Sequence, residues 1–343
     1  MRALVFTRYG GPLTVLDVPP PAAPPGGVVV RVGATGVCRS DWHAWQGHDT
    51  SVALPHVPGH ELAGTVETVG EGVRRWRTGD RVTAPFVCAC GTCPPCAAGE
   101  QQVCARQSQP GFTHWGSFAE LVMLEHADVN LVGLPPQLSL AAAASLGCRT
   151  ATSFRAVVQV GRVRPGEWVA VHGCGGVGLA AVQVAVAAGA RVAAVDISPG
   201  ALALAQQLGA EVVVDARLTD DVAEALVHLT GGGAHVSLDA FGSASTCQAS
   251  VRCLRVRGRH VQVGLLPDGA HLPMDVVVAR ELAVLGSHGL AAHAYPGLLA
   301  LVVGGRLRPE LLVTRELDLS DAADALARVG EAPGIAVITS FAG

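Results

Sequence analysis

The chain has 343 residues, half of them apolar and only 15% charged, so it can build a large core and is not disordered throughout. Its length suggests two domains, and its net charge of -4 argues against a partner that is a nucleic acid. All 24 cationic side chains are arginines, and the absence of lysine excludes Schiff-base chemistry and a lysine-containing phosphate loop.

Up to about residue 135, the sequence consists of short apolar segments interrupted by glycine and proline. This punctuation is typical of an irregular β-barrel or sandwich. Two turn-rich segments, 19–27 and 91–99, separate some of these strands. The strands that we expect cover residues 3–7, 28–32, 62–69, 81–84 and 118–124.

From about residue 141 the pattern changes, and a helix over 141–160 is followed by regular alternation of strands and helices. This alternation predicts a parallel, doubly wound sheet. From about residue 290 the tail mixes helix and strand, with a strand at 335–339. The expected strands of the sheet are 168–171, 191–196, 211–214, 235–239, 260–263 and 282–285, and the helices are 177–188, 200–208, 220–229 and 245–254.

The longest uncharged run, 168–190, has the length of a membrane span, but it contains His172 and a cluster of glycines. A buried strand, a turn and a helix are therefore expected there instead, and we expect no membrane partner. The beginning of the sequence lacks the apolar core of a signal peptide, and ten cysteines then point to metal ligands or free thiols rather than disulfides. The expected compartment is the cytoplasm.

A glycine motif follows the strand at 168–171 directly and precedes a helix. It has the pattern G-x-G-x-x-G, and its residues are Gly173, Gly175, Gly176, Val177 and Gly178. Such a turn lets the backbone approach a pyrophosphate, and the helix N-terminus offers free N–H groups to it. We therefore predict a dinucleotide site rather than a purely structural turn.

Asp196 ends the next strand, 18 residues after Gly178. A carboxylate at this place accepts a hydrogen bond from a ribose 2′-hydroxyl and repels a 2′-phosphate. No cation stands in the three residues that follow, so NAD(H) is favoured over NADP(H). The alternative is an ordinary solvent-facing aspartate at a strand end.

Four cysteines with short spacings lie in a loop rich in glycine and proline: Cys90, Cys93, Cys96 and Cys104. Four thiolates so spaced can close a tetrahedral shell around a structural zinc ion. Cys88 is a fifth cysteine nearby, interpreted as a bystander although ligation by it stays open. The loop has no lysine and little arginine, which disfavours a nucleic-acid zinc ribbon; the other alternative is a set of reduced thiols.

Three further potential ligands, Cys38, His60 and Cys148, are unremarkable one by one, since a lone cysteine or histidine usually packs or faces solvent. Together they supply two cysteines and one histidine, the known ligand set of the catalytic zinc in alcohol dehydrogenases, which leaves one position open. The chain resembles the zinc-dependent medium-chain alcohol dehydrogenase family over nearly its whole length. The matching motifs are GVCRSDWH (36–43), GHE (59–61), the four-cysteine lobe (90–104), GSFAE (116–120), LGCRTAT (146–152) and GCGGVG (173–178).

The resemblance implies a fold of two parts: a GroES-like catalytic domain, residues 1–150 and 290–343 with the zinc lobe at 88–105, and a Rossmann NAD-binding domain, residues 151–289. It implies two zinc ions per chain, with Cys38, His60 and Cys148 as ligands of the catalytic one. The roles that it implies for other residues are as follows: Asp41 accepts from the imidazole of His60, Glu61 is a carboxylate beside the metal, Ser40 and His43 form a proton relay, Arg39 contacts the pyrophosphate and Thr152 lies beside the nicotinamide.

One position departs from the family pattern. Many relatives carry a basic residue after the glycine of the last strand, where this chain has Ile335 after Gly334. A cofactor phosphate contact is then either missing or supplied elsewhere.

The predicted function is reversible hydride transfer between NAD and a primary or secondary alcohol, giving an aldehyde or ketone. Trp42, Trp45 and Trp115 adjoin the motifs and would wall a pocket for an aromatic or bulky apolar alcohol; packing in the barrel core is the alternative. The alternative functions are a polyol dehydrogenase or zinc-free enone or quinone reductase of the same fold, and a non-enzymatic nucleotide- or metal-binding protein. The resemblance also implies a homodimer or homotetramer.

Overall fold

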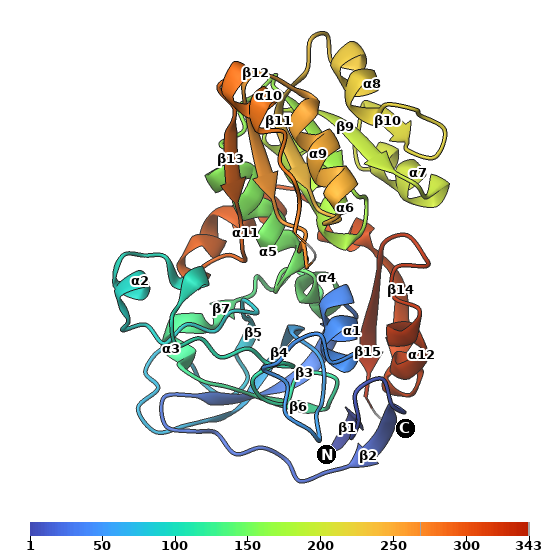
Figure 1. Ribbon diagram of the computed structural model, residues 1–343. Helices are drawn as coiled ribbons and strands as arrows, with labels where there is room; N and C mark the ends of the chain where they lie inside the picture. Colours follow the sequence, from blue (N-terminus) through green and yellow to red (C-terminus); the bar gives the residue numbers. More distant parts are fainter. Residues whose placement is uncertain (268, 342–343) are drawn as a thin grey trace.

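The computed structural model describes residues 1–267 and 269–341. Two separate sheets dominate it, one built from the middle of the chain and one from its two ends, with α4 (Leu140–Ala144) and α5 (Arg149–Phe154) between them (Figure 1). Within the described residues, no helix combines the length and apolarity needed to cross a membrane. The uncharged run at 168–190 forms a strand, a turn and a helix, as predicted.

The middle of the chain forms a six-stranded parallel sheet in the order β10-β9-β8-β11-β12-β13. From β8 the chain adds β9 and then β10 on one side of the sheet. It then returns to the centre and adds β11, β12 and β13 on the other side, so the strand order reverses between β8 and β11. In open α/β sheets the ligand crevice lies at the carboxyl ends of the strands at this point. The strands are β8 (Trp168–His172), β9 (Arg191–Asp196), β10 (Val212–Asp215), β11 (Ala234–Asp239), β12 (Leu254–Gln262) and β13 (Ala283–Gly286).

The connecting helices bury apolar faces against this sheet, and β8 is buried along its whole length. The helices are α6 (Gly176–Ala187), α7 (Pro199–Gln207), α8 (Val222–Leu229), α9 (Ala244–Arg252) and α10 (Met274–Ala279). The predicted doubly wound sheet is confirmed, with observed bounds close to the expected ones. β12 begins six residues earlier than expected, and α10 was not predicted.

The N-terminal part forms most of the second, mainly antiparallel sheet, whose main path runs β14-β15-β3-β4-β5-β7, with β6 paired to β3. A two-stranded ribbon, β1 with β2, lies beside it (Figure 1). The strands of this part are β1 (Arg2–Val5), β2 (Thr14–Asp17), β3 (Val28–Gly36), β4 (Glu61–Val69), β5 (Arg81–Thr83), β6 (Leu121–Leu124) and β7 (Val132–Gly133), and its helices are α1 (Arg39–Trp45), α2 (Pro94–Ala97) and α3 (Ala127–Asn130).

The C-terminal segment returns to the second sheet after the parallel sheet is complete. Its last strand, β15 (Ile335–Ser340), pairs with β14 (Val313–Asp318) and with β3 from the N-terminal part. The accompanying helices are α11 (Tyr295–Val303) and α12 (Ala322–Ala327). The two sheets therefore confirm the predicted fold class, a β part assembled from both ends of the chain and a Rossmann-type part between them, whereas the precise domain boundaries remain a prediction.

The helix predicted over 141–160 is wrong as a single element. The structure has α4, then a break at residues 145–148, then α5, which continues as a π-helical stretch, Arg155–Val160. Cys148 at the break has φ of -129° and ψ of -72°, which is not helical backbone. The break allows Cys148 to precede a helix rather than lie within one, and this placement brings its thiol to the site described below.

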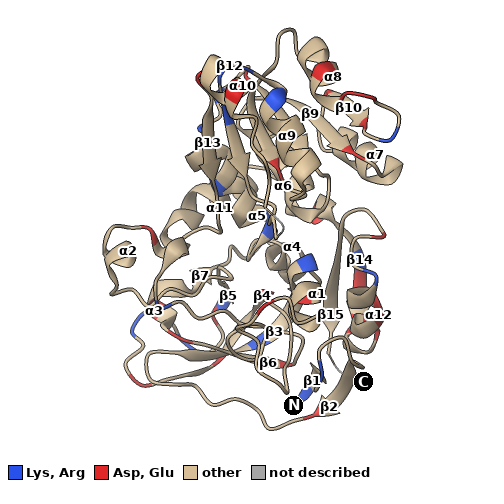
Figure 2. Ribbon diagram, viewed as in Figure 1, with Lys and Arg blue, Asp and Glu red and all other residues tan. Residues whose placement is uncertain are grey.

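Charged residues of both signs are thinly spread over the fold (Figure 2).

Candidate active site and metal sites

Three separate segments bring the predicted catalytic ligands together. Cys38 caps α1 after strand β3, His60 precedes strand β4, and Cys148 stands before α5. One ligand atom from each, with an oxygen of Glu61, lies within 4.8 Å of all the others, and all four residues are buried. The structure thus places side chains separated by up to 110 positions in one group.

Asp41 is fully buried, and its hydrogen bonds connect the Cys38 segment with the His60 segment. Its Oδ1 accepts hydrogen bonds from His60 Nδ1 (2.8 Å) and from the backbone N–H of Gly59 (3.0 Å), while Oδ2 accepts from the N–H of Cys38 (3.0 Å). Because Nδ1 of His60 carries the proton toward Asp41, Nε2 keeps its lone pair. Asp41 therefore sets both the position and the tautomer of the histidine.

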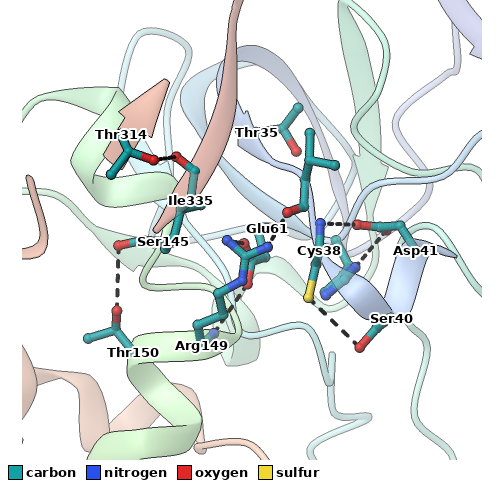
Figure 3. A network of polar contacts seen from close by, with 12 residues as sticks. Thr35, Cys38, Ser40, Asp41, Glu61, Ser145, Arg149, Thr150, Thr314 and Ile335 are labelled. Carbon is teal, nitrogen blue, oxygen red and sulfur yellow. Dashed lines mark hydrogen bonds and ion pairs between the residues drawn. The ribbon is translucent and has the colours of Figure 1, made fainter. Parts of the chain in front are cut away.

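Glu61 links the third segment. Its Oε1 accepts from the backbone N–H of Arg149 (3.2 Å), and its Oε2 forms an ion pair with the guanidinium of that residue (3.3 Å), as Figure 3 shows. Burial raises the pKa of Glu61 to about 7, although the charge of Arg149 acts in the opposite sense. The carboxylate is thus held between Cys38 and Cys148 by a buried cation.

The donor set fits zinc. Nε2 of His60 is buried and has no hydrogen-bond partner, which is the state expected of a nitrogen that a metal would use. A hydrogen bond from the Cys148 thiol, together with the positive charge of Arg149, holds the pKa of Cys38 well below its usual range. Two sulfurs and one imidazole nitrogen are the ligand types that zinc takes, and the thiolate is the form that binds it.

The four cysteines of the lobe form a second, separate group. Their sulfurs lie 3.3 Å (Cys93 to Cys96), 3.6 Å (Cys93 to Cys104) and 3.5 Å (Cys104 to Cys90) apart. Zn–S bonds of about 2.3 Å at tetrahedral angles would separate the sulfurs by about 3.8 Å, so the set is only slightly contracted.

Neighbouring donors, chiefly backbone N–H groups, lower the pKa of Cys90 and Cys93, whereas burial raises the pKa of Cys96 to about 12. The N–H of Thr92 is the largest of the influences that lower the pKa of Cys90 to about 5. Arg106, which the sequence did not single out, donates to the Cys90 sulfur (3.5 Å). Cys88 is outside the group, and burial raises its pKa to about 12, so it stays a neutral thiol.

The glycine turn has the local geometry that phosphate binding requires. Gly173 has a φ of +88°, and a Cβ on Gly178 would collide with the carbonyl of Gly173, so both positions need glycine. A Cβ on Gly175 would meet nothing within 4 Å, which leaves open space beside the N-terminus of α6. Gly176 and Val177 are the first two residues of that helix.

Asp196 lies beside this turn at the carboxyl end of β9. Its Oδ2 accepts from the N–H of Cys174 (2.6 Å) and its Oδ1 from that of Ser198 (2.8 Å). These bonds fix the carboxylate at the edge of the open space and leave lone pairs on both oxygens. Thr152, on α5, has a buried hydroxyl oxygen without a hydrogen-bond partner, which suits a contact with a ligand.

The side chains of the predicted relay lie along α1. Ser40 places its hydroxyl 3.8 Å from the Cys38 sulfur, and His43 lies three residues further on the same helix face. Nδ1 of His43 lies 2.9 Å from Nδ1 of His48, so one ring donates a hydrogen bond to the other. Burial, and then the charge of His48, lower the pKa of His43. The guanidinium of Arg39 donates to the carbonyl of Val329 (3.1 Å) and stacks over Trp42.

Two family models match the chain: "Alcohol dehydrogenase GroES-like domain" over residues 24–136 and "Zinc-binding dehydrogenase" over residues 176–304. An alcohol dehydrogenase of Rhizobium meliloti (strain 1021) is 41% identical over 291 residues, 84% of each chain. The chain belongs to the zinc-type medium-chain dehydrogenase/reductase family.

Solved structures agree with this assignment. An alcohol dehydrogenase from Thermus sp. ATN1 superposes with a TM-score of 0.90 at 34% identity, covering 99% of this chain and 100% of the other. A structure described as an NAD-dependent alcohol dehydrogenase has a TM-score of 0.90 at 33% identity, with the same coverage.

The aromatic rings beside the metal group are not the tryptophans that the sequence pointed to. The rings that lie edge-on to His60 are Phe86 (6.1 Å between centroids) and Phe112 (5.3 Å), neither of which was singled out. Trp45 and Trp115 instead donate their indole N–H groups to backbone carbonyls within the N-terminal part. Trp42 packs edge-on against His43 and His48, so it borders the relay.

Proposed function

We propose that this protein is an NAD-dependent zinc alcohol dehydrogenase that interconverts a primary or secondary alcohol with its aldehyde or ketone. The observation that carries the proposal is the buried donor set of Cys38, His60 and Cys148, with Nε2 of His60 unpartnered, in a chain that also has the glycine turn of a dinucleotide fold. Family membership supports an oxidoreductase that acts on alcohols.

Each residue of the site would have a distinct role in holding zinc or in moving the proton. Cys38, His60 and Cys148 would hold zinc, and Asp41 would keep the imidazole oriented. Zinc supplies Lewis-acid chemistry there, by lowering the pKa of an alcohol hydroxyl or polarising a carbonyl. Ser40, beside the Cys38 sulfur, would receive the hydroxyl proton, and His43 would move it toward solvent with His48.

The glycine turn would hold the pyrophosphate of NAD, a cofactor whose nicotinamide ring supplies the hydride acceptor when it is bound. Asp196 would accept from the adenosine ribose, and the absence of a cation at residues 197–199 supports the choice of NAD over NADP. The buried Thr152 hydroxyl would serve the nicotinamide end.

The substrate class that best suits the site is an apolar alcohol with an aromatic or bulky group. Phe86 and Phe112 flank His60 and would give the substrate an apolar wall. The predicted tryptophan wall would then contribute through Trp42 beside the relay.

β13 lies at one edge of the parallel sheet, and this edge is the surface through which an oligomer would assemble. Among the residues that the structure describes, β13 pairs with β12 alone and ends the strand order, and Val284 on it is 38% exposed. The free edge of such a strand can pair with a second copy of the chain, and a homodimer formed in this way would be the first oligomeric state to test.

The proposal is tested by counting zinc per chain and then measuring turnover. Elemental mass spectrometry is expected to give two zinc ions, and Cys38→Ser is expected to remove one and to abolish NAD-coupled oxidation of benzylic and aliphatic alcohols while NADH binding persists. Cys247→Ser, at a buried thiol in α9, is the matched control and keeps both ions. One zinc in the unmodified protein, with reduction of enones, would instead assign it to the zinc-free reductases.

A further inference from the structure

Arg149 is a buried cation to which the proposed mechanism gives no role. It is the first residue of α5, immediately after Cys148, and it is only 5% exposed. Its NH1 is buried and has no hydrogen-bond partner, and its NH2 donates to the carbonyl of Val37. An arginine is rarely buried to this extent unless it is paired with a charged or polar group.

One side of the guanidinium faces the metal group. Glu61 lies 3.3 Å from NH1 but is not aligned for a hydrogen bond, so the pair is held mainly by charge. The backbone approaches closely to admit this carboxylate, because a Cβ on Gly36 would collide with the Glu61 side chain. Figure 3 shows the two side chains together, between the Cys38 segment and α5.

The other side of Arg149 lies against the dinucleotide turn. A Cβ on Gly176 would be 2.7 Å from Nε of Arg149 and nearer still to its Cδ. Gly176 is the first residue of α6, and it has no positive φ that would demand glycine, so the arginine side chain is the reason for a glycine there. The neighbouring Gly175 faces open space. The guanidinium is therefore packed directly on the helix N-terminus that would receive a pyrophosphate.

A bound pyrophosphate carries about two negative charges, whereas a helix N-terminus offers about half a positive charge. The turn from Gly173 to Gly178 contains no cation and the chain has no lysine. Arg39, for which the resemblance implies a pyrophosphate contact, lies on α1 and donates to the carbonyl of Val329. Ile335, at the start of β15, brings no charge either. Arg149 is the guanidinium that the structure packs against this turn.

We propose that Arg149 is a cofactor-positioning residue, which stabilises the pyrophosphate at the N-terminus of α6 and is itself held in place by Glu61. The proposal rests on the proposed function, since it requires a dinucleotide at this turn. It also gives Glu61 a task other than ligation, namely to anchor the cation that faces the cofactor.

The experiment measures the affinity of the zinc-loaded protein for NADH, ADP-ribose and adenosine by fluorescence and calorimetry. Arg149→Met is expected to weaken the binding of NADH and ADP-ribose about 2- to 30-fold, the range for loss of a charge beside a helix terminus, and to leave the binding of adenosine unchanged. Arg149→Lys, which keeps the charge, is expected to recover part of this loss. A purely structural role would weaken all three ligands together.

Arg155→Met is the matched control, because it removes a guanidinium six residues further along that is paired with the surface residue Glu100. Glu61→Gln is expected to weaken the binding of ADP-ribose no more than Arg149→Met does, because it leaves the cation present. A loss larger than that of Arg149→Met would assign the effect to Glu61 and overturn the role of Arg149. If Arg149→Met does not fold, the double variant with Glu61→Gln removes both charges and is measured in the same way.

The two proposals fail differently. If the unmodified protein binds neither NADH nor ADP-ribose, the dinucleotide function is wrong and the role of Arg149 falls with it. If the unmodified protein binds both and folded Arg149→Met binds them equally well, the dinucleotide function stands and the role of Arg149 is overturned.

Discussion

Replacing Asp41 by asparagine tests whether this carboxylate organises the metal group. The two oxygens of Asp41 accept three hydrogen bonds, from His60 Nδ1, from the N–H of Gly59 and from the N–H of Cys38. Asparagine has the same shape but only one acceptor oxygen. Whichever way the amide is oriented, its NH2 faces at least one N–H group that cannot reach water.

The size of the effect follows from these contacts. A hydrogen bond to a charged group contributes about 1.5–3 kcal/mol, and leaving a buried donor unsatisfied costs about 1–3 kcal/mol. Asp41→Asn loses one such bond and keeps two weakened ones, so we expect the unfolding free energy of the zinc-free protein to fall by about 2–4 kcal/mol. Loss of a group that orients a metal-ligating histidine typically lowers metal affinity about 10- to 100-fold.

Two measurements on the same variant separate these effects. Competition with a chelator is expected to remove the zinc proposed at Cys38, His60 and Cys148 from Asp41→Asn at lower chelator concentrations than from the unmodified protein, while the ion proposed in the lobe is held as before. Asp221→Asn, at the N-terminal cap of α8, serves as the control, since its carboxylate accepts from a single exposed N–H group. Unchanged affinity for both ions in folded Asp41→Asn would refute the role assigned to Asp41.

Three further substitutions address other parts of the site. Asp196→Ser is expected to narrow the preference for NAD over NADP in kcat/KM, and an unchanged ratio would contradict the ribose contact. Cys104→Ser is expected to release the zinc proposed in the lobe and to lower the melting temperature, whereas Cys88→Ala, outside the cluster, is expected to keep the zinc content unchanged. Elemental analysis measures the zinc content and calorimetry measures the melting temperature. Burial and neighbouring charges lower the pKa of His43 below its ordinary value, so the neutral base is present at pH 7. The rate of alcohol oxidation is therefore expected to fall only as the pH drops below about 6.5. His43→Asn should remove that acidic limb from the pH–rate profile, and His228→Asn on the surface should retain it.

The sequence predicted the parts of the site whose chemistry depends on residue type and spacing. The four-cysteine lobe and the strand–turn–helix of the glycine motif follow from local patterns, and the structure has both. The break before Cys148 could not be seen in this way, because an alanine-rich stretch has high helix propensity and only the long-range contact of Glu61 with the Arg149 N–H shows why the helix restarts there.

For a related reason, the sequence alone did not indicate the roles of Arg149, Phe86 and Phe112. Each is ordinary in its own segment, and each acquires meaning only from a residue far away in the chain, Glu61 for the arginine and His60 for the two rings. The sequence did contain one signal for Arg149. Gly176 is a glycine that the G-x-G-x-x-G turn does not require, and it marks a place where a bulky side chain approaches the helix. Contacts across the chain, rather than local pattern, decide these positions.

The two metal groups differ in what holds their donors in place. In the catalytic group, two buried carboxylates connect the donor segments through backbone N–H groups: Asp41 joins the Cys38 and His60 segments, and Glu61 joins the latter to α5. In the lobe, the small buried cluster consists of Ala89 and the four cysteines themselves, and the bond from the Cys90 N–H across to the far end of the lobe goes to the sulfur of Cys104. Protein hydrogen bonds therefore connect the segments of the catalytic group independently of zinc. In the lobe, two backbone hydrogen bonds between Cys88 and Ser108 (2.8 and 2.9 Å) join the two ends, whereas the sulfurs between these ends contact one another. The metal that these sulfurs would bind would therefore order the interior of the loop rather than its ends.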